Sequence, residues 1–133
     1  MEETDIFINP TSNSPQVELR PKDGFIRISG VSISYEGVSI LEQFLNSIGN
    51  YFKTPLRMTH VEIELNYFNT KSALALYNIL MLLETHNKSG DSAVDVIWIA
   101  ESDDEVLQEA ADDYQSIFPD LPIKKVIVKA LAA

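Results

Sequence analysis

Apolar and polar residues alternate strictly between positions 61 and 66. Apolar residues stand at 61, 63 and 65 and polar residues at 62, 64 and 66, which is the pattern of a strand that buries one face. A polar turn follows, and residues 73–84 then begin an apolar-rich helix that continues to about residue 86. Asn69 or Thr70 is therefore expected at or near the N-cap, where a side-chain oxygen accepts from unpaired backbone N–H groups.

Two further helices are predicted from apolar residues at three- and four-residue spacing. The first begins at Val38, after an irregular loop over residues 31–37, and ends before Thr54-Pro55 because proline cannot continue a helix. The second helix begins after a cap at Ser102 or Asp103. Its inner side is expected to consist of Val106, Leu107, Ala110, Ala111, Tyr114, Ile117 and Phe118.

Short apolar runs predict the remaining strands. They comprise an edge strand over residues 5–8, two strands over 17–19 and 25–28, a central strand within 94–99 and a last strand over 126–128. A tight link from Pro21 to Gly24 makes the second and third runs a hairpin. Gly90 is placed to end the central helix in a left-handed conformation.

This order of elements predicts a single α/β domain over residues 1–133. The first strands form an antiparallel hairpin, and the second half alternates strand, helix, strand, helix and strand, with the spacing of crossovers between parallel strands. We therefore expect a mixed β-sheet with helices packed on it.

Composition narrows the classes of partner. The hydrophobic fraction of 45% is that of a folded chain, and the formal charge of −10 argues against nucleic acid as the main partner. Cysteine is absent, which excludes disulfides and thiolate sites. The start is acidic and lacks a secretion signal, and no apolar run reaches about 18 residues. We expect a soluble cytoplasmic protein without direct membrane insertion.

No pattern of residues indicates catalysis. His60 and His86 lie far apart without ligand partners at helical or strand spacing, and the five glycines form no phosphate-binding loop. Glu62 and Glu64 share a strand face and could act as an acid–base pair, although a solvated strand face is the simpler interpretation. We expect no catalytic residue, no metal ligand, no cofactor and no enzyme activity.

An acidic segment follows the central strand. Its carboxylates belong to Glu101, Asp103, Asp104, Glu105, Glu109, Asp112 and Asp113, and no lysine or arginine lies among them. Three interpretations remain open: a solvated helix face matched to the helix dipole, a docking surface for a basic partner, and a weak divalent-cation site made of oxygen ligands.

The helix after Thr70 carries two apolar residues that packing on the sheet does not explain. At about 100° per residue, Leu74, Asn78 and Met81 fall on the same side as Thr70. Either a neighbouring helix covers them, or they form a partner surface. Thr70 is either a plain N-cap or a regulatory phosphorylation site, because a phosphate is favoured at the positive end of a helix dipole.

Three stretches resemble the SiaC family of bacterial regulatory phosphoproteins. They are Tyr67-Phe68-Asn69-Thr70 opening the central helix, the early strand and glycine at residues 24–30, and the acidic helix at residues 101–114. The resemblance spans nearly the whole chain.

The resemblance implies a fold similar to the anti-sigma-factor antagonists (STAS-like) and a phospho-switch at Thr70. It implies three partners: a protein kinase of the histidine-kinase-like ATPase type, an opposing PP2C-type phosphatase, and a diguanylate cyclase (GGDEF) that the unmodified protein binds in cyclic-di-GMP signalling and biofilm behaviour. The alternative is a constitutive adaptor in which Thr70 is only a helix cap. The residues expected to contact a partner are Tyr67, Asn69, Lys71, Ser72, Leu74, Asn78, Met81, Asp103 and Asp104.

Overall fold

Six strands form one sheet whose spatial order is the same as their order along the chain. The computed structural model describes residues 4–129, so the first three residues of the acidic start and residues 130–133 lie outside the described part. The strands are β1 (Ile6–Ile8), β2 (Gln16–Arg20), β3 (Phe25–Ser32), β4 (Met58–Phe68), β5 (Ala93–Glu101) and β6 (Ile123–Val128). The helices are α1 (Tyr35–Tyr51), α2 (Thr70–Ser89) and α3 (Glu105–Ile117).

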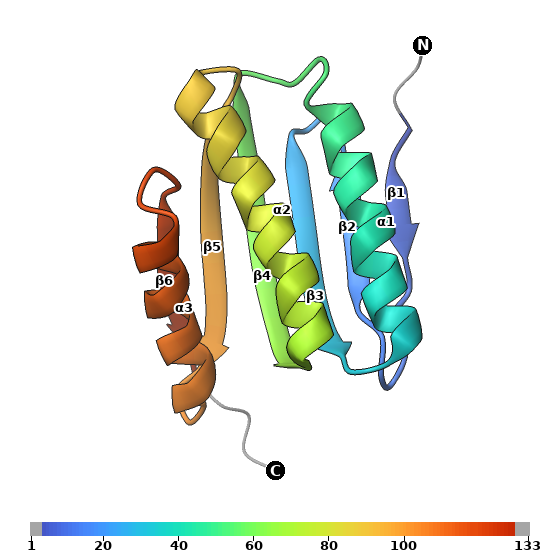
Figure 1. Cartoon of the computed structure of the whole chain (residues 1–133), viewed down its shortest axis with the longest axis vertical. Helices are drawn as coiled ribbons and strands as arrows, with labels where there is room; N and C mark the ends of the chain where they lie inside the picture. The colour runs from blue at the N-terminus through green and yellow to red at the C-terminus, as the bar shows by residue number, and fades with distance from the viewer. Residues whose placement is uncertain (1–3, 130–133) are drawn as a thin grey trace.

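The sheet is mixed, as the sequence predicts. β1, β2 and β3 pair antiparallel, whereas β3, β4, β5 and β6 pair parallel, and a helix connects each consecutive parallel pair. Because each crossover runs in the same sense, the carboxyl ends of the parallel strands and the N-terminal ends of the helices meet at one edge of the sheet (Figure 1). The predicted fold class is confirmed.

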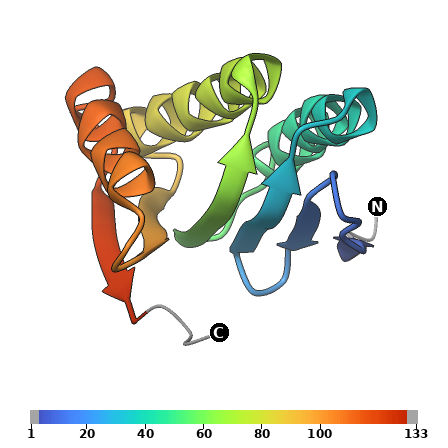
Figure 2. The same cartoon turned by 90° about the horizontal axis from the view of Figure 1, so that it is seen from below.

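All three helices cover the same face of the sheet, and the opposite face is left open (Figure 2). The core lies between the two layers, and Trp98 of β5 is the largest side chain that it buries fully. The indole Nε1–H of Trp98 donates to the backbone oxygen of Leu107, at 3.0 Å, and so ties β5 to α3. Edge-to-face contact with Phe68 and a tilted contact with Tyr114 surround the indole ring.

The predicted irregular loop over residues 31–37 is wrong. β3 continues to Ser32, and α1 begins at Tyr35, three residues before the predicted start at Val38. Two local features explain the difference. Gly30, at φ 96°, lies where the β3–β4 register shifts, so the strand continues past an irregularity. The Ser34 side chain then accepts from the Gly37 N–H at 2.9 Å and caps α1.

The ends of α2 and α3 were predicted with mixed success. Gly90, at φ 85°, ends α2 in the predicted left-handed conformation. α3 is capped by Asp104, not by Ser102 or Asp103. Val106 and Ile117 are exposed, so their predicted place on the inner side is wrong: each lies roughly 80–100° around the helix from the buried Leu107.

Candidate functional site

Exposed apolar side chains gather where the parallel strands end. Among the described residues, the four most exposed large apolar side chains are Tyr35 (89%), Val106 (77%), Tyr67 (70%) and Leu74 (62%). Tyr35 and Val106 stand in the first turns of α1 and α3, Tyr67 near the end of β4 and Leu74 near the start of α2. We call these four residues the apolar rim. The ends of β3, β4 and β5 and the starts of the three helices lie along the lower edge of the molecule in Figure 1.

The cap of α2 is Asn69 rather than Thr70. The Asn69 Oδ1 accepts from the Ser72 N–H at 2.8 Å, and its own backbone is extended, at φ −82° and ψ 178°. Thr70 is therefore the first helical residue, and its side chain is exposed. The interpretation of Thr70 as a plain N-cap is wrong, since Asn69 performs that task.

Ser72 does not lie on the surface, so its prediction as a partner contact is wrong. It is fully buried, and its hydroxyl donates to the Ser32 backbone oxygen at 2.8 Å. The same oxygen accepts from the Asn69 N–H at 3.1 Å. The start of α2 is thus fastened to the end of β3, which holds Thr70 in a defined place at the edge.

One face of α2 remains uncovered along its length. Leu74 and Met81, at 62% and 44% exposure, are not covered by a neighbouring helix, so that interpretation is wrong. Lys71 is exposed and Asn78 is half-buried on the same side. The opposite side of α2 packs on the sheet as predicted, with Leu76, Leu80 and Leu83 fully buried.

The first turn of α2 differs from those of the other helices. α1 carries Glu36 and α3 carries Glu105 in the first turn, where carboxylates offset the positive end of the helix dipole. α2 has no acidic residue there. The exposed hydroxyl of Thr70 therefore stands at a helix N-terminus whose positive end is not offset by an acidic side chain in that turn.

A groove of about 720 Å³ opens next to this turn. Pairing between β4 and β5 stops at Ile63 and Trp98, although β4 continues to Phe68 and β5 to Glu101. The groove is lined by residues 66–68 of β4, by Glu101, Asp103 and Asp104, and by Val106, Leu107 and Ala110 of α3. The Asp104 Oδ1 accepts from the Leu107 N–H at 3.1 Å, so this carboxylate also caps α3.

The comparisons with known proteins agree with this geometry. A family model described as SiaC family regulatory phosphoprotein matches residues 8–128. The chain belongs to the SiaC family. No curated protein sequence matches this family member.

Solved SiaC structures share the fold of this SiaC-family chain. SiaC of Pseudomonas aeruginosa is 21% identical, with a TM-score of 0.84 over 95% of this chain and 100% of that one. Apo-SiaC from the same organism is 22% identical, with a TM-score of 0.82 over 96% and 100% of the two chains. A complex of the diguanylate cyclase SiaD with its activator SiaC, also from Pseudomonas aeruginosa, matches at 22% identity with a TM-score of 0.85 over 93% and 100%.

The charged residues considered for catalysis lie elsewhere in the SiaC-family chain. Glu62 and Glu64 face the open side of the sheet, and one guanidinium holds both, with Arg27 Nη1 to Glu62 Oε1 at 2.6 Å and Nη2 to Glu64 Oε1 at 2.7 Å. Both carboxylates therefore serve an ion-pair cluster on a solvated strand face, and the acid–base interpretation has no support in the geometry.

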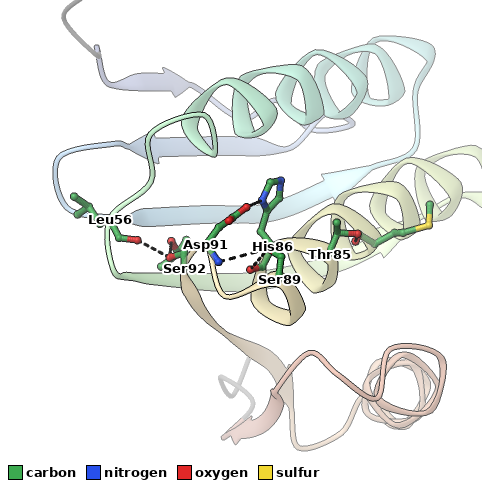
Figure 3. Close-up of polar contacts among 8 residues, drawn as sticks. Leu56, Thr85, His86, Ser89, Asp91 and Ser92 are labelled. Carbon is green, nitrogen blue, oxygen red and sulfur yellow. Dashed lines mark hydrogen bonds and ion pairs between the residues drawn. The ribbon is translucent and has the colours of Figure 1, made fainter.

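The two histidines each pair with an aspartate. His60 Nδ1 lies 2.6 Å from Asp95 Oδ1 on the sheet, and His86 Nδ1 lies 2.8 Å from Asp91 Oδ2 at the end of α2 (Figure 3). The hydrogen bond with His86 lowers the pKa of the Asp91 carboxyl below its ordinary value. Within residues 4–129, no three metal-ligating side chains come together, so the divalent-cation interpretation of the acidic segment gains no geometric support.

The sequence missed two members of the apolar rim. Tyr35 falls in the stretch predicted as irregular, and a cap signal was available there in Ser34 followed by an acidic residue at position 36. Val106 was assigned to the wrong side of α3.

None of the described helices is long and apolar enough to cross a membrane.

Proposed function

We propose that this SiaC-family chain is a cytoplasmic phospho-switch that acts by binding rather than by catalysis. In its unmodified form it binds a diguanylate cyclase through the apolar rim and the exposed face of α2. Phosphorylation of Thr70 by a protein kinase of the histidine-kinase-like ATPase type releases the cyclase, and a PP2C-type phosphatase restores binding.

The position of the Thr70 hydroxyl carries the proposal. Asn69 caps α2, so Thr70 is free to be modified without loss of the cap. Ser72, the nearest alternative hydroxyl in the same turn, is fully buried and bonded to Ser32. Thr70 is therefore the accessible acceptor at this edge of α2.

The charges at the start of α2 are compatible with a phosphate on Thr70. A phosphate adds roughly −1.5 to −2 charges, and the first turn of α2 contains no carboxylate that would repel it. The exposed ammonium of Lys71 is adjacent in sequence and can pair with a phosphate. The fold can therefore accept the modification at the N-terminus of α2.

The same charge opposes binding of a partner. Leu74, on the same side of the helix one turn later, and Tyr67, just before the cap, are apolar surfaces that a partner would cover. Covering them next to a dianion requires the phosphate to lose water, and the single ammonium of Lys71 offsets only part of its charge, so binding becomes costly. The complex of SiaC with the cyclase SiaD supports a diguanylate cyclase as the partner class.

The first experiment measures modification. The purified chain is incubated with the cognate kinase and ATP, and the site is located by mass spectrometry. We expect phosphate on Thr70 in the natural sequence and none in Thr70→Ala. Phosphate found only on another residue would overturn the site assignment.

The second experiment measures binding to a diguanylate cyclase of the same organism by calorimetry. We expect Thr70→Ala to bind as the natural sequence does, and Thr70→Glu to bind at least about tenfold more weakly, since a desolvated charge without a partner costs more than about 1.4 kcal/mol. Ser116→Glu is the matched control, because it places the same charge on an exposed hydroxyl position of α3. Equal affinity of Thr70→Glu and the natural sequence would favour a constitutive adaptor.

A further inference from the structure

The groove beside Thr70 lies between the end of β4 and α3, where β4 and β5 have stopped pairing. At the far end of the molecule α2 and the end of α3 are held together: the rings of Tyr77 and Phe118 lie 5.1 Å apart, and the Asp120 N–H donates to Glu84 Oε2 at 3.0 Å. At the near end β4 and β5 have already stopped pairing. The groove therefore lies toward the carboxyl ends of these strands, with the end of β4 on one side and α3 on the other.

The chemistry of the groove selects one kind of occupant. Phe68, Leu107 and Ala110 supply an apolar interior, and the exposed Tyr67 and Val106 stand at its mouth. One wall carries the carboxylates of Glu101, Asp103 and Asp104, and the described residues that line the groove include no lysine, arginine or histidine. An anion would be repelled, and a purely apolar side chain would desolvate the carboxylates without pairing them.

We propose that this groove receives an arginine or lysine side chain of the partner protein. The aliphatic stem of such a residue packs on the apolar interior, while its charged head reaches the carboxylates of Glu101 and Asp103. The ring of Tyr67 at the mouth adds a face on which a cation is attracted. This inference rests on the proposed function, because it names the chemistry by which the partner is held.

The location of the groove links this contact to the switch. Residues 66–68, which form one wall, lead directly into Asn69 and Thr70. A partner anchored in the groove is therefore placed over the modified residue. A phosphate on Thr70 would therefore oppose binding of the partner segment that the groove holds next to it.

A small probe tests the groove without any partner protein. The ¹⁵N-labelled chain is titrated with N-acetyl-arginine amide, and the backbone amide shifts are followed by NMR. N-acetyl-citrulline amide, which has nearly the same shape but no charge, serves as the control ligand. We expect saturable shifts at residues 66–68 and 106–110 with the arginine probe only.

A matched pair of variants assigns the effect to the groove. Glu101→Gln/Asp103→Asn neutralises its wall and leaves Asp104 to cap α3, whereas Glu109→Gln/Asp113→Asn removes the same charge from exposed positions of α3 outside the groove. We expect the first variant to abolish the saturable shifts and the second to retain them. Equal shifts with citrulline, no saturation, or equal loss in both variants would overturn the inference.

Binding of the cyclase separates this inference from the proposed function. We expect Glu101→Gln/Asp103→Asn to weaken cyclase binding about tenfold, or 1.4 kcal/mol, and the control variant to leave it unchanged. If Thr70→Glu weakens binding while both double variants bind as the natural sequence does, the groove inference fails and the phospho-switch stands. If the probe binds the groove but Thr70→Glu has no effect, the switch fails and the groove stands.

Discussion

Two buried serines fasten the start of α2 to β3, and their hydrogen bonds have a fixed direction. Ser72 Oγ lies 2.8 Å from the Ser32 backbone oxygen, to which it can only donate. It also lies 2.7 Å from Ser32 Oγ. Because the single hydrogen of Ser72 is used on the carbonyl, Ser32 must donate its own hydrogen to Ser72. The two residues are therefore not equivalent, although both are serines with no exposed surface.

This direction predicts unequal costs for the two alanine substitutions. Ser72→Ala removes both bonds and leaves the buried Ser32 hydroxyl without an acceptor. It should lower the free energy of unfolding by at least about 3 kcal/mol, from about 1 kcal/mol for each of the two bonds and about 1 kcal/mol or more for the stranded donor. Ser32→Ala removes one bond and leaves Ser72 bonded to the carbonyl, so it should cost about 1 kcal/mol. The double variant should cost no more than Ser72→Ala alone.

Urea unfolding measures these differences. The chain contains one tryptophan, Trp98, which is buried between β5 and α3 and reports the loss of packing by fluorescence. All four proteins should show the same dependence on urea and different midpoints. If Ser32→Ala costs as much as Ser72→Ala, or if the two losses add in the double variant, the assigned direction is wrong.

Two further predictions concern the opposite end of the molecule. Four hydrogen bonds form a closed ring there. The Leu56 N–H donates to the Tyr51 hydroxyl, which in turn donates to the Thr59 hydroxyl. Thr59 donates to Ser92, and Ser92 donates back to the Leu56 backbone oxygen at 2.7 Å (Figure 3). Thr59→Val breaks this buried ring at two places and should lower the free energy of unfolding by about 2–3 kcal/mol in urea, whereas Thr59→Ser should retain most of the stability; equal losses would contradict the ring. The second prediction concerns pH. The hydrogen bond with His86 lowers the pKa of Asp91 in the folded state below its ordinary value, so the Asp91–His86 contact stabilises the fold above the pKa of the unfolded chain and is lost as the pH falls through the folded pKa. The urea midpoint of Asp91→Asn should therefore fall less than that of the natural sequence between about pH 5 and pH 3, and parallel curves would refute this.

The sequence is sufficient for the fold because its signals are local. Alternation at residues 61–66 and helical spacing in three segments give the elements, and the hairpin link and Gly90 give two of the turns. The order of elements then restricts the sheet to few arrangements. The errors fall at element boundaries, where the Ser34 and Asp104 caps depend on local geometry.

The site is only partly predictable, because its parts meet through the topology. Tyr67, Thr70 and Leu74 are neighbours in sequence and were found, whereas Tyr35 and Val106 reach the same edge from other helices. The burial of Ser72 depends on Ser32, which lies 40 residues earlier. The groove depends on where β4 and β5 stop pairing, and neither strand shows this in its own pattern.

The uncovered face of the sheet has a consequence for how copies of the chain meet. One register row crosses all six strands there, through Phe7, Glu18, Arg27, Glu62, Ile97 and Lys124. Its central members are charges of alternating sign: Arg27 and Glu62 are partly exposed to water, whereas Glu18 is buried and paired with Arg20. Laying a second sheet on this face would strip water from those ions and return little apolar contact. This charged row therefore opposes the stacking of a second sheet on the uncovered face.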